Sequence, residues 1–125
     1  MDTIERWHDY VRTRDPALLE ALIDDDCTFR SPAVHSAQRG KAITCRYLAA
    51  ATDVLGTADF RYTDEWRAER SAVLEFESVV GGMTVNGVDI IHWNGDGQII
   101  SFKVMARPVK GLHALIAAMA AELAA

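Results

Sequence analysis

The stretch VNGVDIIHWNGDGQIISFKVMARP, residues 85–108, decides the fold. Its two apolar, β-branched runs are joined by Asn94-Gly95-Asp96-Gly97, a glycine-rich turn that favours a β-hairpin. One carboxylate, Asp89, lies inside the first run. Burying a carboxylate there costs several kcal/mol unless it is paired or protonated. Asp89 is therefore the first candidate for a functional group.

The preceding hairpin predicts the neighbours of Asp89 on one side. Side chains alternate between the two faces of a strand, so the turn centre sets which residues face each other. With Gly81-Gly82 at the turn centre, Asp89 lies opposite Leu74 and Gly87 lies opposite Phe76. A glycine beside Phe76 removes a side chain from this face and permits the sheet to bend. The sequence thus predicts a curved sheet with Asp89 on its inner face.

The following hairpin completes the inner face. With Gly95-Asp96 at its centre, Asp89 is predicted opposite Phe102, and Ile91 opposite Ile100. The inner face is then apolar apart from Asp89 and carries Leu74, Phe76, Val85, Gly87, Ile91, Ile100, Phe102 and Val104. The outer face is mixed and carries Val73, Glu75, Glu77, Val79, Asn86, Val88, Ile90, His92, Ser101, Lys103 and Arg107.

The other elements are predicted from capping residues and from periodicity. Apolar residues at helical spacing indicate helices after Asp2, after Asp15-Pro16, over residues 41–55 up to Gly56, and after Pro108. Short strands are predicted over residues 27–31, 59–68 and 71–80, and the acidic run 24–26 is predicted to be a solvated turn. Helices followed by a meander indicate one α+β domain, residues 1–125, in which helices cover one face of a curved antiparallel sheet.

Composition excludes several classes of function. The chain has 125 residues, of which 50% are hydrophobic, and a formal net charge of −5. No Lys/Arg run is present, so we expect no nucleic-acid partner. The first fifteen residues mix charged and apolar side chains, which excludes a secretory signal, and we expect a cytoplasmic protein without a membrane partner. The four histidines are scattered, so no metal site is predicted and the chemistry is expected to need no cofactor.

The order of elements, the segment CTFRSP before a loop and a third helix, and the run 85–108 together resemble the nuclear transport factor 2-like superfamily, in particular its SnoaL-like and ketosteroid isomerase-like bacterial branch. The resemblance implies a cone around an apolar cavity and a homodimer formed through the outer sheet face. Asp89 matches the strand aspartate that ketosteroid isomerases keep protonated as a hydrogen-bond donor to an oxyanion. It is also similar to the acid/base aspartate of SnoaL-type cyclases.

Two positions depart from the isomerases. Their general-base aspartate falls on Ser31 and the tyrosine of their oxyanion hole falls on Trp7. A serine without a base does not shuttle a proton, so the ketosteroid isomerase mechanism is not expected. We expect instead a small isomerase, cyclase or hydratase acting on a largely apolar small molecule. The alternative is a noncatalytic ligand-binding or dimeric assembly module, in which Asp89 is structural and satisfied by the Trp7 N–H, a tyrosine hydroxyl or water.

The candidate site residues follow from the face assignment of the strands and from the family resemblance. Asp89 and His35, a histidine that the resemblance places at the cavity mouth, are the predicted catalytic residues. Aromatic side chains with a polar atom are candidate hydrogen-bond donors, although their spacing equally suits core packing. The predicted ligand-binding residues are Trp7, Ser31, Tyr47, Tyr62, Trp66, Leu74, Phe76, Phe102 and Val104.

Overall fold

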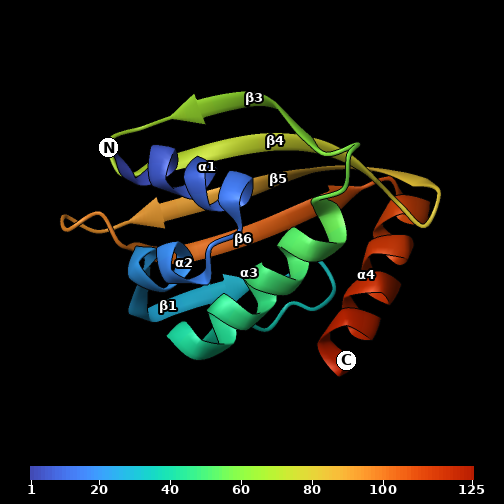
Figure 1. The fold of residues 1–125 in the computed structure, drawn as a ribbon, viewed down its shortest axis with the longest axis horizontal. Helices are drawn as coiled ribbons and strands as arrows, with labels where there is room; N and C mark the ends of the chain where they lie inside the picture. The colour runs from blue at the N-terminus through green and yellow to red at the C-terminus, as the bar shows by residue number, and fades with distance from the viewer.

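In the computed structural model, which describes residues 1–125, four helices lie against one face of a curved six-stranded sheet (Figure 1). The helices are α1 (Thr3–Thr13), α2 (Pro16–Leu22), α3 (Lys41–Leu55) and α4 (Val109–Ala124). The strands are β1 (Ile23–Arg30), β2 (Gln38–Arg39), β3 (Arg61–Arg67), β4 (Ser71–Val80), β5 (Met83–Trp93) and β6 (Ile99–Arg107). No helix is both long and apolar enough to cross a membrane.

The strand order is β2-β1-β6-β5-β4-β3. The predicted α+β layout is confirmed, but the sheet is mixed rather than purely antiparallel, because β1 runs parallel to β6. The acidic run 24–26 belongs to β1 and is not a separate turn. Pairing of β1 with β6 is interrupted between Ile23 and Thr28, so Asp25 and Asp26 stay exposed to water within the strand.

The helix ends agree with the capping residues. The Asp2 carboxylate accepts a hydrogen bond from the Glu5 backbone N–H at 2.8 Å, and Asp15 accepts one from the Ala17 N–H at 3.0 Å. These contacts satisfy N–H groups that a helix start otherwise leaves unpaired. α1 thereby begins next to β3, which places Trp7 and His8 over the inner face of the sheet.

The β4–β5 hairpin has the predicted register. Asp89 pairs with Leu74 and Gly87 pairs with Phe76, with the turn at Gly81-Gly82. A Cβ on Gly87 would lie 2.5 Å from Cζ of Phe76. The glycine is therefore required by the Phe76 ring, which occupies the space that the missing side chain leaves.

The β5–β6 register differs from the prediction by two residues. Asp89 pairs with Val104, and Ile91 with Phe102, because the turn spans four residues, with the Asn94 N–H bonded to Gln98 O at 2.9 Å. A two-residue shift preserves the faces. A separate irregularity between His92 and Trp93 shifts the register by one residue, so that Trp93 pairs with Ile99. This second shift turns Ile100 away from the inner face, where it is 40% exposed, and Ile99 takes its place in the core.

A bulge in β3 changes which residues of that strand face inward. The register with β4 shifts between Tyr62 and Asp64, so that Tyr62 pairs with Phe76 and Glu65 pairs with Leu74. An extra residue in one strand exchanges the two faces beyond it. Glu65 is therefore turned inward toward α1, and Trp66 is turned outward.

Candidate functional site

A cavity of about 260 Å³ lies between the helices and the inner face of the sheet. Of the 25 residues that line it, 19 are hydrophobic, and Asp89 is the one charged residue among them. The cavity is bounded by α1, β1 and its following loop, α3, the strands β3 to β6, and α4. Its lining residues are Trp7, Val11, Phe29, Ser31, Pro32, Ala33, Val34, Gln38, Tyr47, Leu48, Ala51, Thr52, Leu55, Gly56, Phe60, Tyr62, Phe76, Asp89, Phe102, Val104, Leu115, Ile116, Met119, Ala120 and Leu123.

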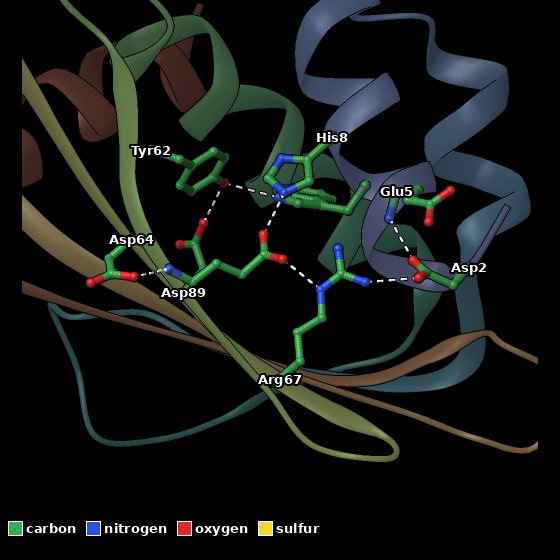
Figure 2. A network of polar contacts seen from close by, with 9 residues as sticks. Asp2, Glu5, His8, Tyr62, Asp64, Arg67 and Asp89 are labelled. Atoms are coloured by element: carbon green, nitrogen blue, oxygen red, sulfur yellow. Dashed lines mark hydrogen bonds and ion pairs between the residues drawn. The ribbon is translucent and has the colours of Figure 1, made fainter.

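Asp89 is held by a short chain of hydrogen bonds, here called the cavity cluster (Trp7, Tyr62 and Asp89). The Tyr62 hydroxyl donates to Oδ2 of Asp89 at 2.6 Å, and Nε1 of Trp7 donates to the Tyr62 oxygen at 2.9 Å. Figure 2 shows Tyr62 from β3 pointing at Asp89 from β5. Because both donors are committed to this chain, the orientation of the Asp89 carboxyl group is fixed.

The second oxygen of Asp89 is not engaged by the protein. Oδ1 has no hydrogen-bond partner in the protein, although Asp89 is only 7% exposed. Every side-chain nitrogen or oxygen that is sealed from water in this structure has a partner. Oδ1 is therefore not sealed, and since Asp89 lines the cavity, a small molecule there reaches this atom.

Burial raises the pKa of Asp89 to about 7, and the hydrogen bond from Tyr62 opposes only part of this rise. Desolvation disfavours the charged form of a carboxyl group, and no cation stands close enough to compensate. Burial likewise raises the pKa of Tyr62, which keeps that hydroxyl protonated and donating. Near neutral pH, Asp89 therefore exists in both protonation states, which is the condition for an efficient acid/base group.

Tyr47 on α3 offers a second polar atom to the cavity. Its ring stacks on Phe29 with centroids 5.5 Å apart, and its hydroxyl has no hydrogen-bond partner in the protein. Of the other hydroxyls of the lining, Thr52 already donates to Leu48 O at 2.7 Å, whereas Ser31 accepts from the Ala33 N–H at 3.2 Å and keeps its own O–H free. The Tyr47 hydroxyl is thus an available donor for a ligand oxygen.

The structure brings most of the predicted site residues together. Those that line the cavity are Asp89, Trp7, Ser31, Tyr47, Tyr62, Phe76, Phe102 and Val104. Three do not reach it. Trp66 is 52% exposed because the β3 bulge turns it outward, and Leu74 is wholly buried in packing below the cavity wall. His35 is exposed in the loop after β1 and lines a separate hollow on the protein surface.

The sequence reasoning missed the contribution of α4. Leu115, Ile116, Met119 and Leu123 of this helix line the cavity where α4 packs against α3 and the strands β4 to β6. Their helical spacing predicts an apolar stripe, which was the available signal, but a stripe does not say which surface it covers. Gly111 shows which surface α4 covers, because the helix backbone there lies so close to β5 that a Cβ would collide with the backbone oxygen of Thr84. The helix therefore approaches β5 closely and encloses the cavity.

A second polar group, here called the rim cluster (Asp2, His8, Glu65 and Arg67), lies beside the cavity cluster. His8 Nε2 lies 2.7 Å from Glu65 Oε1, and Arg67 bridges Glu65 to Asp2, which it contacts at 2.7 Å. The His8 ring stands edge-on to Tyr62 with centroids 5.2 Å apart (Figure 2). No group of three or more His, Cys, Asp or Glu side chains is arranged to hold a metal ion.

Comparison with known proteins gives both a family and a fold. The model of the SnoaL-like domain matches residues 4–102. A crystal structure of a steroid delta-isomerase from Pseudomonas aeruginosa is similar, with 36% identity and a TM-score of 0.92 over 98% of this chain and 89% of that one. A cystatin-like protein conserved in bacteria, from Silicibacter pomeroyi, has 33% identity and a TM-score of 0.87 over 95% and 83%.

A more distant structure shares the fold alone. An NTF2-like protein of unknown function from Mesorhizobium loti is 19% identical, with a TM-score of 0.72 over 85% of this chain and 88% of that one. A search of the curated proteins finds no match. The predicted nuclear transport factor 2-like fold is therefore confirmed by structures at several levels of identity.

Proposed function

The chain belongs to the SnoaL-like domain family, and we propose that it is a small enzyme of the isomerase, cyclase or hydratase type that needs no cofactor. Its substrate is a largely apolar, carbonyl-containing small molecule bound in the cavity. Asp89 is the acid/base residue. The observation that carries this proposal is the free Oδ1 of a carboxyl group whose pKa is raised to about 7 and whose other oxygen is held by Tyr62.

The substrate class follows from the lining. The cavity offers no Lys, Arg or His side chain, so it has no partner for a charged group of the substrate inside it. Its volume of about 260 Å³ falls just below the roughly 300–1,000 Å³ that is usual for drug-sized ligands, which favours a small molecule. Burial of an apolar substrate also expels water from around Asp89 and keeps the pKa of its carboxyl group raised.

In the proposed reaction, Oδ1 of Asp89 moves a proton from one carbon of the substrate to another. Ionised Asp89 removes a proton from the carbon next to the substrate carbonyl with Oδ1, and the electron pair of that C–H bond forms the C=C bond of an enolate. The negative charge collects on the former carbonyl oxygen, where the Tyr47 hydroxyl donates a hydrogen bond. Asp89 then returns the proton from Oδ1 to another carbon. The identity of 36% with a steroid delta-isomerase supports chemistry of this type.

The experiment uses a β,γ-unsaturated cyclic ketone as the probe, because its conversion to the conjugated ketone is measured by ultraviolet absorbance. Asp89→Asn keeps an acceptor for Tyr62 but removes the base, so the rate is expected to fall by about 10²- to 10⁴-fold. Asp59→Asn, a change of the same type at an exposed carboxylate away from the cavity, is the control and is expected to leave the rate unchanged.

Full activity in the Asp89→Asn variant would remove Asp89 from the mechanism. Binding of the ketone without any turnover in the unmodified protein would instead favour the noncatalytic alternative. Calorimetry with the same ketone separates the two, since it measures binding whether or not a proton is transferred.

The outer sheet face supports a second proposal, that two copies of the chain pair through it. Apolar side chains on this face are exposed to water, among them Trp66 at 52% and Val79 at 36%. They alternate with charged residues, and Val73, Val88 and Ile90 extend the apolar area. Exposed apolar area rimmed by charge is typical of an interface. Light scattering is expected to give the mass of a dimer, and a monomer at all concentrations would contradict it.

A further inference from the structure

A second hollow, of about 630 Å³, lies on the surface where β1 ends and the chain turns into the loop before β2. Four of its lining residues are basic: Arg30, His35, Arg39 and Lys103. No Asp or Glu lines it, although the chain as a whole carries a formal charge of −5. The hollow is therefore a local concentration of positive charge on an acidic protein.

The cations of this hollow have no carboxylate partners in the protein. Neither Arg30, Arg39 nor Lys103 forms an ion pair, whereas Arg12, Arg61 and Arg67 elsewhere all do. Arg30 and Lys103 are moreover directly opposite each other on β1 and β6. Their like charges, held on neighbouring strands, repel each other. An anion placed in the hollow removes this repulsion.

The hollow adjoins the apolar cavity. Arg30 and Lys103 lie on the outer face of the sheet, whereas the cavity lies on the inner face, and the two spaces meet past the end of β1, where Ser31, Pro32, Val34 and Val104 line both. Val34, at this boundary, is 54% exposed. A small molecule that passes around the end of β1 is therefore able to occupy the cavity with one end and reach the hollow with the other.

We propose that the hollow binds the anionic head of an amphipathic ligand whose apolar body lies in the cavity, and that the head is a carboxylate. This inference rests on the proposed function, because it places the apolar part of the substrate in the same cavity. Arg30 supplies a planar fork suited to a carboxylate, and Lys103 supplies a second donor across the strand pair. The ligand class is thereby narrowed from apolar molecules to apolar acids.

The test compares two linear probes that differ only in the head group, decanoate and decanol, by calorimetry. In the unmodified protein, decanoate is expected to bind about tenfold more tightly than decanol, because its head forms hydrogen bonds to cationic groups. The double variant Arg30→Gln/Lys103→Gln is expected to lose this advantage and to bind decanol unchanged. Arg61→Gln/Arg70→Gln removes the same charge away from both spaces and is the control.

A second measurement needs no variant. Raising the salt concentration from about 0.1 M to about 1 M shortens the Debye length from about 10 Å to about 3 Å and is expected to weaken decanoate binding relative to decanol. Equal affinities for the two probes in the unmodified protein would overturn the carboxylate site and leave the apolar cavity standing. Failure of both probes to bind would overturn the apolar cavity as a ligand site, and this inference with it.

Discussion

The cavity cluster and the rim cluster share the elements α1 and β3, to which β5 adds Asp89, and they lie against each other, yet their carboxyl groups are held in opposite ways (Figure 2). Neighbouring residues of α1 belong to different clusters: Trp7 is part of the cavity cluster and His8 is part of the rim cluster. On β3, Tyr62 belongs to the cavity cluster and Glu65 belongs to the rim cluster. The bulge between Tyr62 and Glu65 lets both side chains face α1.

The two carboxyl groups show what decides a pKa at this site. Burial raises the pKa of Glu65, but hydrogen bonds from His8 and Arg67 outweigh it, and the net pKa is lowered. Burial also raises the pKa of Asp89, and its neutral partner Tyr62 does not outweigh it, so the pKa stands at about 7. The two pKa values therefore shift in opposite directions because Glu65 has the cationic partner Arg67 and Asp89 has none. Asp89 is suited to proton transfer because the nearby cation belongs to the rim cluster and does not contact it.

The largest expected effect is on stability and tests the cost of the buried carboxylate. Asp89→Asn is expected to raise the free energy of unfolding at pH 8 by about 4 kcal/mol at most, since a pKa raised from 3.8 to about 7 corresponds to roughly 1.36 kcal/mol per unit. At pH 4 the gain is expected to be near zero, because Asp89 is then largely protonated in the folded state. Urea unfolding at the two pH values measures both.

The sign follows from proton binding. Between pH 3.8 and about 7 the folded protein holds a proton on Asp89 that the unfolded chain has lost, so this group makes stability fall as pH rises through that window and leaves it level above. Asp89→Asn is expected to remove this slope. An identical slope in the variant would show that the carboxyl group is not desolvated.

A smaller effect, a loss of stability, is expected when Tyr62, the neutral hydrogen-bond partner of Asp89, is changed. Tyr62→Phe leaves Nε1 of Trp7 and Oδ2 of Asp89 without their bonds, which is expected to cost about 1–3 kcal/mol. It also removes the contact that lowers the pKa of Asp89, so the pH at which activity is half-maximal is expected to shift upward. Tyr47→Phe is the matched control for stability alone, because its hydroxyl has no partner in the protein but has a proposed role in the reaction. Equal losses of stability from the two variants would contradict the role of Tyr62.

The smallest effect on stability is expected for a change in the rim cluster. Glu65→Gln replaces a partly exposed carboxylate that contacts His8 and Arg67, and exposed ion pairs contribute about 0.2–1 kcal/mol. The loss is expected to disappear in about 1 M salt, which screens such pairs. Thermal unfolding at low and high salt measures it. A large loss that persists in salt would mean that the two clusters are one unit.

The parts of this structure that the sequence predicted are those encoded by short-range signals. The Gly81-Gly82 turn leaves one register for β4 and β5, so the partners of Asp89 on that side were predictable. The caps Asp2 and Asp15 mark helix starts through contacts with residues two or three positions away. Local hydrogen-bond geometry alone is sufficient for these features.

The parts that escaped prediction depend on backbone irregularities or on distant contacts. The bulge that turns Trp66 outward and the shift that expels Ile100 leave no mark in residue type, so Ile100 was predicted on the inner face and Trp66 in the ligand site. The parallel pairing of β1 with β6 joins segments about seventy residues apart. The assignment of α4 to the cavity depends on its docking against Thr84, which the amphipathic pattern of the helix does not contain.

The β3 bulge has a consequence for how this site changes during evolution. Because the bulge at Thr63 sets the face that every later residue of the strand takes, the rim cluster depends on the backbone geometry of β3 and not only on its residue types. Deletion of Thr63 would leave a regular strand with Tyr62 and Glu65 still facing inward, whereas loss of the bulge at unchanged length would bring Trp66 inward and send Glu65 to solvent. Relatives whose strand keeps this length but pairs without a bulge are therefore expected to differ in charge beside the cavity, however similar their remaining sequence.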